Sequence, residues 1–147
     1  MKVVVSDLGA LKELLKTVVN EALEYDVAPE VQIMLSENAQ RDVYDAYKPF
    51  VYGRSYSLTD GAAETYDVKS SGDMKVEVSV NHPYGKLIEY GDGVDGMHYD
   101  YPYNRNNTED QFLRPRPFYR HTKEQLENGK YKELMAQSLR AKGISIS

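Results

Sequence analysis

The residues best suited to hold a metal ion lie in one segment, which offers three carboxylates and one imidazole: Asp92, Asp95, His98 and Asp100. Such groups suit hard or borderline cations. Their spacing does not fit a calcium-binding loop, because placing Gly96 at the invariant glycine position puts Pro102 where the terminal glutamate belongs. Asp and Gly are also the usual residues of exposed turns. A metal-dependent hydrolase using this Asp92–Asp100 loop stays an alternative, and we expect no bound metal or cofactor.

Other side chains that commonly do chemistry are scattered along the chain. There is no cysteine, which excludes a thiolate zinc site, an iron–sulfur cluster and a cysteine nucleophile. His82 precedes a proline in an expected turn, and His121 follows Arg120 on an expected helix. The sequence contains no Gly-x-Ser-x-Gly elbow, phosphate-binding glycine loop or His-Glu-x-x-His zinc motif. We therefore expect a protein without catalysis.

A basic and aromatic segment near the C-terminal end is the candidate for nucleic-acid binding. It contains Arg114, Arg116, Arg120 and Lys123 around Phe118 and Tyr119. Such residues can contact a phosphate backbone. Prolines on both sides of Arg116 instead suggest a stiff approach to a helix, whose basic side chains are usually solvated or paired with acidic ones. A nucleic-acid-binding module using this basic C-terminal segment is the second alternative.

Tyrosine is unusually common, with 13 copies against three phenylalanines and no tryptophan. Three of them alternate within an acidic, glycine-rich segment, residues 91–110, whose composition does not suit a core element. Tyrosine rings on an extended segment offer a large contact area for few lost rotamers. We expect this loop either to pack on itself or to contact another subunit. The candidates for a subunit interface are Tyr99, Tyr101, Tyr103, Arg114, Arg116 and Tyr119.

The elements that position these residues begin and end with helices. Either Ser6 or Asp7 is suited to cap a helix, and apolar residues follow at helical spacing: Leu8, Leu11, Leu14, Leu15, Val18, Val19, Ala22 and Leu23. Pro29 predicts a kink or a restart. Near the other end, Pro117 is placed to open a helix, Gly129 to interrupt it and Gly143 to end it. The sequence thus predicts helices over residues 7–47 and 117–142.

Residues 48–113 are expected to form strands and loops. Met74–Asn81 alternates apolar and polar residues, which predicts a strand with one buried face. Leu87–Tyr90 follows a turn and predicts a second strand, paired with the first as a hairpin. Residues 48–73 read as loop and edge strand. Together these elements predict one α+β domain, residues 1–147, with N-terminal helices and a C-terminal helix packed on a small antiparallel sheet, and a long acidic, tyrosine-rich loop.

Charge is divided along the chain, although the net charge is only −5. Residues 1–110 hold 10 Lys and Arg against 20 Asp and Glu, whereas residues 111–147 hold 8 against 3. No apolar run approaches the roughly 20 residues that cross a bilayer, and the N-terminal residues lack a signal-peptide core. We expect a protein with no membrane partner and with two regions of opposite charge that suit contact between subunits.

Three segments resemble, in the same order, motifs of the tail-completion family of long-tailed bacteriophages, which includes minor tail and head–tail joining proteins. The first, residues 43–58, contains Tyr-x-Pro and Tyr-x-Arg followed by leucine, and the second, Tyr84–Gly91, ends in hydrophobic-Glu-aromatic-Gly. The third begins with Arg116-Pro-Phe and ends, after an amphipathic helix, in Lys-Gly-Ile at residue 144. The chain departs from this pattern in the acidic insertion that begins at Asp92, and in Gly53 and Ser55 around Arg54.

The resemblance implies a structural virion protein of the phage neck or tail, made in the host cytoplasm. Such a protein takes part in virion assembly as a homo-oligomeric ring, of which a hexamer is one form, and joins the tail to the head. Its implied partners are other copies of itself, tail-terminator or tail-tube proteins and head-closure proteins. DNA would pass through the ring channel without sequence-specific binding.

Overall fold

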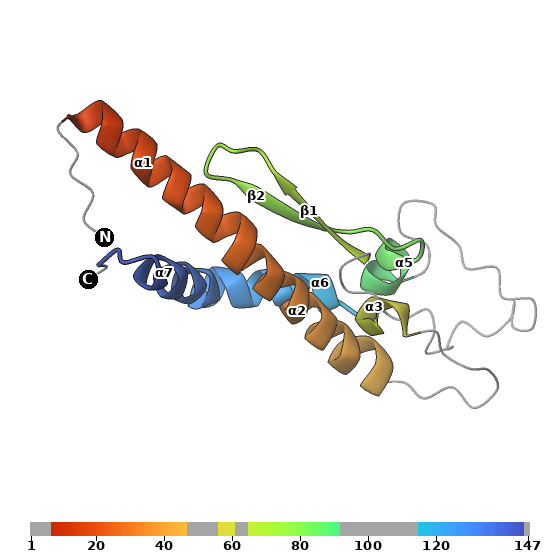
Figure 1. Ribbon diagram of the computed structural model, residues 1–147. Helices are drawn as coiled ribbons and strands as arrows, with labels where there is room; N and C mark the ends of the chain where they lie inside the picture. The colour runs from red at the N-terminus through yellow and green to blue at the C-terminus, as the bar shows by residue number, and fades with distance from the viewer. Residues whose placement is uncertain (1–6, 47–55, 61–64, 92–114, 146–147) are drawn as a thin grey trace, which may run out of the picture.

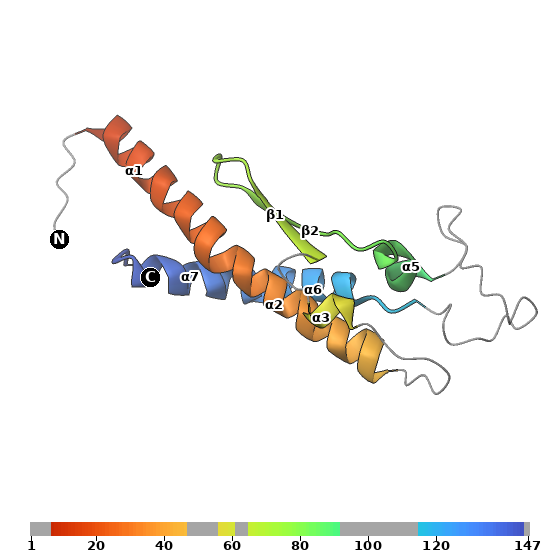
Figure 2. The same ribbon diagram turned by 45° about the vertical axis from the view of Figure 1, so that its right-hand side comes forward.

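The structure is a computed structural model that describes residues 7–46, 56–60, 65–91 and 115–145. The described part contains two helical arms, a β-hairpin and two short helices (Figure 1). The arms cross where their middle segments meet, and the hairpin lies alongside the N-terminal arm (Figure 2). The expected α+β class, with helices toward both ends of the chain and a small antiparallel sheet, is confirmed.

The N-terminal arm is continuous through four helical segments: α1 (Leu8–Glu21), η1 (Ala22–Val27), α2 (Ala28–Ala39) and η2 (Gln40–Asp45). Asp7 caps α1 as predicted, because its Oδ1 accepts the backbone N–H of Ala10 at 2.8 Å. Segment η1 is a wider, π-helical turn in which the N–H of Ala28 donates to the carbonyl of Leu23. The wider turn accommodates Pro29, which lacks an N–H, so the arm restarts as α2 at this proline.

The C-terminal arm is broken once, at the predicted glycine. It consists of α6 (Phe118–Gln125), η5 (Leu126–Lys130) and α7 (Tyr131–Ala141). Gly129 has φ 115° and ψ −12°, which is not helical. Gly143, at φ 85°, ends the arm while the N–H of Ile144 donates to the carbonyl of Leu139 at 2.9 Å. This is the usual way in which a glycine closes a helix, so both glycine predictions are confirmed.

The sheet is one antiparallel hairpin of β1 (Tyr66–Ser70) and β2 (Val76–Val80), in which Tyr66 faces Val80 and Ser70 faces Val76. The predicted strand at residues 74–81 is confirmed, and its partner comes from the expected edge strand. The predicted strand at Leu87–Tyr90 is wrong, because these residues belong to a short helix, α5 (Gly85–Tyr90). A run of four residues shows no clear period, so sequence alone does not separate the two structures.

The core lies between α2, the hairpin and the start of α6. Its largest side chains with almost no exposure are Tyr66 and Phe118, joined by Leu35 and by Leu58 of α3 (Ser57–Asp60). A second cluster joins the two arms and contains Val27, Met34 and Leu134. By contrast, α1 buries none of its residues. Among the described helices, none has the length and apolar character needed to cross a membrane.

Candidate functional site

The three motif segments meet around one aromatic ring, which makes this junction the first place to look for function. Leu58 of the first motif and Phe118 of the third are fully buried in the same cluster, and Ile88 of the second packs against it. The backbone also joins the last two motifs, since the N–H of Arg116 donates to the carbonyl of Ile88 at 2.8 Å. Segments that are far apart in sequence therefore form one structural unit, called the motif junction below.

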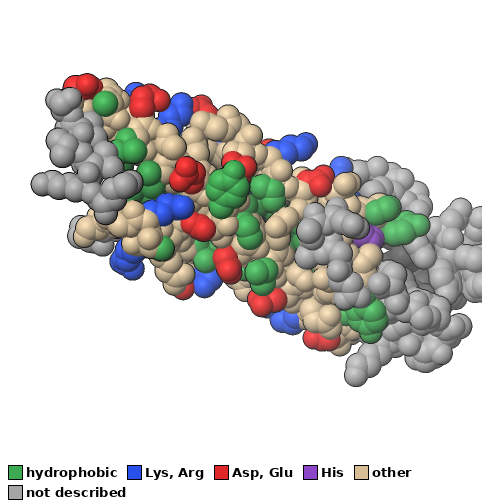
Figure 3. All heavy atoms as spheres, in the orientation of Figure 1, with side chains coloured by type: hydrophobic (Ala, Val, Ile, Leu, Met, Phe, Trp, Pro, Cys, Tyr) green, Lys and Arg blue, Asp and Glu red, His purple; other side chains and the backbone are tan. Residues whose placement is uncertain are grey.

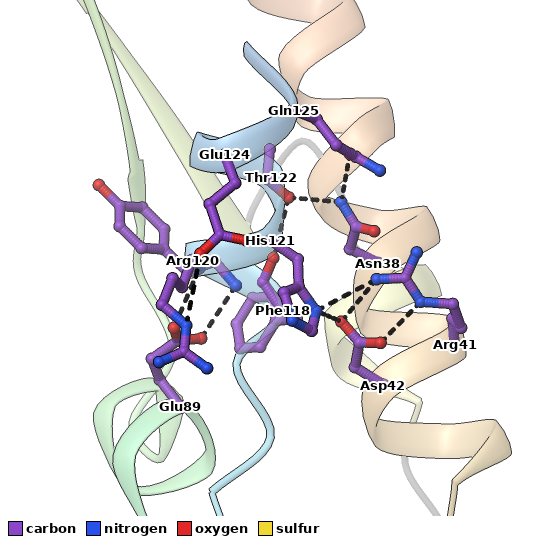
Figure 4. A network of polar contacts seen from close by, with 11 residues as sticks. Asn38, Arg41, Asp42, Glu89, Phe118, Arg120, His121, Thr122, Glu124 and Gln125 are labelled. Carbon is purple, nitrogen blue, oxygen red and sulfur yellow. Dashed lines mark hydrogen bonds and ion pairs between the residues drawn. The ribbon is translucent and has the colours of Figure 1, made fainter. Parts of the chain in front are cut away.

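Glu89, the glutamate of the second motif, is the central polar group of the motif junction (Figure 4). Its side chain is on α5 and only 5% of the residue is exposed. One carboxylate oxygen accepts the N–H of Tyr119 and the other accepts the N–H of Arg120, both at 2.9 Å. These are free amides of the first turn of α6, where the helix dipole also favours a negative charge. Glu89 thus holds the beginning of α6 from another helix.

The first motif is fixed by tyrosine hydroxyls. The N–H of Leu58 donates to the hydroxyl of Tyr44 at 3.0 Å, and the hydroxyl of Tyr66 donates to the carbonyl of Leu58 at 2.7 Å. Burial, together with the nearby Tyr44, raises the pKa of Tyr66 above its ordinary value, so this hydroxyl keeps its proton. Tyr44 also stacks at an angle on Tyr56, with 4.8 Å between the ring centroids. These tyrosines position α3 on the arm.

A polar network joins α2 to α6 on the other side of Phe118 (Figure 4). Asn38 donates from its amide nitrogen to Thr122 at 2.7 Å and to Gln125 at 2.9 Å. One turn further along, Asp42 accepts from Arg41 and pairs with Nδ1 of His121, each at 2.7 Å. Burial would raise the pKa of Asp42, but the bonds from Arg41 and His121 outweigh it and hold that pKa below its ordinary value.

A serine and a histidine lie within hydrogen-bond distance at the edge of the motif junction, which sequence reasoning did not predict. Ser57 Oγ and His82 Nε2 are 2.8 Å apart, and burial lowers the pKa of His82. The backbone N–H of Tyr84 points to Nδ1 at 3.2 Å. Because Nδ1 accepts, the neutral ring carries its proton on Nε2 and donates it to Ser57. In this tautomer His82 does not act as a base toward the serine.

An open pocket of about 380 Å³ lies beside this pair and is lined by His82, Glu89, Tyr90 and Tyr119, among others. Glu89 is engaged by α6, and His82 accepts on one nitrogen and donates from the other. Within the described residues, every buried side-chain nitrogen and oxygen has a hydrogen-bond partner. The same part of the chain contains no group of three or more histidine and acidic side chains able to hold a metal ion. The polar groups beside this pocket therefore hold described parts of the fold together.

The interface candidates are only partly within the described structure. Arg116 is half-buried, where the chain enters α6, and Tyr119 is 40% exposed on the rim of the pocket. Tyr99, Tyr101, Tyr103 and Arg114 lie outside the described residues, as does the Asp92–Asp100 segment considered for a metal. Of the basic segment, Arg120 and Lys123 form ion pairs with Glu124 and Glu127 on α6 and η5. Both pairs lie within the C-terminal arm, so they do not join these basic residues to the acidic part of the chain.

Comparison with known families gives the wider relationship. The YomN family profile matches residues 7–141, which covers almost the whole chain and every described element of the two arms and the hairpin. The chain belongs to the YomN family. The YomN match begins at the N-cap of α1 and ends with the last residue of α7, so its range includes the described residues of the motif junction.

The chain is also similar to a protein of bacterial prophage origin. The chain is 29% identical over 120 residues to the SPbeta prophage-derived uncharacterized protein YomN of Bacillus subtilis (strain 168), a match that covers 77% of this chain and 78% of that protein. No solved structure matches the chain with significance. The chain is therefore related to a phage-derived protein.

Proposed function

We propose that this YomN-family protein is a structural component of the phage neck or tail, which assembles as a ring of identical subunits and joins tail to head without catalysis. The prophage origin of its relative supports the phage setting. The resemblance of the three ordered motifs to the tail-completion family supports the more specific role. Its proposed partners are tail-terminator or tail-tube and head-closure proteins, its proposed location is the virion, and DNA would pass through its channel without specific binding.

One contrast carries the proposal: the buried polar side chains of the described residues are hydrogen-bonded within the fold, whereas several apolar side chains of α1 are exposed. Glu89 holds α5 against α6 at the motif junction, and beside it Asn38 and Asp42 hold the N-terminal arm against α6. On α1, four leucines lie exposed: Leu8, Leu11, Leu14 and Leu15. These polar residues thus serve packing within the chain. The exposed leucines of α1 form an apolar surface that is suited to association with another protein. This combination fits an assembly protein better than an enzyme.

The proposal is tested on particles. Purified virions of the phage or prophage that carries the gene are examined by mass spectrometry, and the gene is then deleted. We expect several copies of the protein per particle, and we expect the deletion to yield separate heads and tails in electron micrographs. Complementation with the wild-type gene should restore joined particles. Absence of the protein from particles, or joined and infectious particles from the deletion strain, would refute the proposal.

A further inference from the structure

The exposed side of α1 is the largest run of uncovered leucines in the described structure. We call Leu8, Leu11, Leu14 and Leu15 the leucine face; their exposed fractions range from 37% to 83%. In Figure 3, hydrophobic side chains lie along the α1 part of the molecule, while charged side chains follow its outer edge. A helix of this length gains most of its stability from packing of its apolar side. We therefore expect another apolar surface to pack against the leucine face.

The rest of the described chain contacts α1 elsewhere. Asn20 binds the hairpin turn, because its amide donates to the carbonyl of Gly72 at 2.8 Å and accepts the N–H of Met74 at 2.7 Å. Lys16 pairs with Asp73 of the same turn at 3.2 Å. These residues lie on the side of α1 away from the leucines. In both ribbon views α1 and α7 diverge toward the end of the molecule where α1 begins (Figures 1 and 2).

The spacing of the leucine face is that of a helix-pairing seam. Leu8, Leu11, Leu15 and Val18 occupy successive a and d positions of a heptad, and Leu14 and Val19 occupy the flanking g and e positions. A heptad seam packs best against an identical seam, since its side chains fit the spaces of a helix with the same repeat. A second copy of α1 is therefore the natural occupant.

Charge selects the orientation of this pairing. In a parallel pair, a g residue meets the e residue five positions later on the other helix, which brings Asp7 close to Lys12 and Leu14 close to Val19. In an antiparallel pair, g residues face each other, which brings the acidic Asp7 close to the acidic Glu21. The parallel pair also brings Glu21 close to Asp26, but Asp26 is already paired within its own chain with Lys142 at 3.6 Å, which offsets part of that repulsion. Parallel pairing is thus favoured.

From these observations, and resting on the proposed function, we infer that α1 pairs in parallel with α1 of neighbouring copies and forms a subunit contact of the ring. The fourteen residues of α1 span about 21 Å, which is too small an interface for a stable dimer, because that needs about 800 Å² per partner. Closure of a ring adds further contacts to this one. The a, d, e and g leucines and valines form a broad face that serves neighbours on two sides.

Single cysteines test the contact directly, because the chain has none of its own. Leu15→Cys places a thiol on the seam, and Glu13→Cys places one on the opposite, exposed side of the same helix. Under mild oxidation over a concentration series, we expect Leu15→Cys to form a disulfide-linked dimer and Glu13→Cys to stay monomeric. Leu8→Cys should also link to its own copy, because only a parallel pair brings the two Leu8 positions together. Equal or absent linkage of the Leu15 and Glu13 variants would overturn the inference.

A substitution test distinguishes contact between copies from contact within one chain. Leu15→Glu is compared with Ile33→Glu, whose residue on α2 has a similar exposed fraction, 48% against 43%. We expect Leu15→Glu to abolish linkage through Leu8→Cys while the circular dichroism and melting temperature stay unchanged, and Ile33→Glu to leave linkage intact. Loss of folding in Leu15→Glu would show that the leucine face packs within its own chain, and would also overturn the inference.

Failure of this inference differs visibly from failure of the proposed function. If the cysteine pairs do not link, but the protein is found in particles and its deletion separates heads from tails, the ring uses another contact and the proposed function stands. If the seam cysteines link, but the protein is absent from particles, the self-pairing stands and the proposed function fails.

Discussion

At the scale of single residues, the most informative side chain is Glu89, because it links two motifs through one carboxylate. Hydrogen bonds to a charged group contribute roughly 1.5 to 3 kcal/mol each. Glu89→Ala removes two of them and is expected to lower the free energy of unfolding by about 3 kcal/mol or more. Glu89→Gln keeps one accepting oxygen and should lose about half as much. Urea denaturation measures both, with Glu77→Ala, exposed on β2, as the control. An equal effect of Glu77→Ala would contradict the capping role.

His82 gives a pH-dependent prediction at the same scale. Burial lowers its pKa from the ordinary value of 6.5, so the folded state keeps the ring neutral where the unfolded chain already binds a proton. The contribution of His82 to the free energy of unfolding is therefore fully present above pH 6.5 and is lost as the pH falls from there through the lowered pKa. NMR titration should place the midpoint of His82 below 6.5, with the ring proton on Nε2. A midpoint at or above 6.5, or a proton on Nδ1, would contradict the geometry with Ser57 and Tyr84.

At this scale the sequence motifs include some residues of the motif junction but do not show their roles. Glu89 and Phe118 were part of the quoted motifs, yet nothing local shows that the carboxylate of one caps the helix that begins with the other. The two residues are brought together by the fold, as are Ser57 and His82. A role that depends on a contact between distant segments has no periodic or spacing signal in a single sequence.

At the scale of elements, the long patterns predicted structure well and the short ones did not. α1, β2 and α7 follow clear periods or clear stop residues, and all three are confirmed. α5 is short, and its apolar run fits either a strand or a helix. The periodicity of α1 predicted an amphipathic helix correctly, but periodicity does not say what covers the apolar side. In this chain the described residues leave that side open.

The break between α6 and α7 gives a prediction about an element. A residue with a side chain rarely adopts the backbone of Gly129, at φ 115°, although the space around it is open. Gly129→Ala is therefore expected to lower the free energy of unfolding by about 1 to 2 kcal/mol, from backbone strain alone. The neighbouring exposed Asn128→Ala should change it little. Thermal unfolding compares the two, and a Gly129→Ala protein as stable as wild type would mean that the arm does not need this break.

At the scale of the whole molecule, the division of charge has two uses. Some acidic groups already have partners within the chain: Asp26 forms an ion pair with Lys142, and Asp42 hydrogen-bonds Nδ1 of His121, and both contacts join the C-terminal arm to the N-terminal arm. Only the charges left over are available for contact between subunits. The expectation that acidic and basic regions meet across a subunit boundary therefore stays a prediction, now with fewer charges to support it.

Salt separates an interface made by these remaining charges from one made by the leucine face. Exposed charges are screened beyond roughly 3 Å at about 1 M salt, whereas apolar burial is not weakened by sodium chloride. We expect linkage of Leu15→Cys and the sedimentation of assembled wild-type protein to persist from low salt to about 1 M, with at most a small loss from the Asp7–Lys12 contact. Ammonium sulfate should strengthen assembly further. Dissociation of the assembly at high sodium chloride would show that charge holds the subunits together and that α1 contributes little.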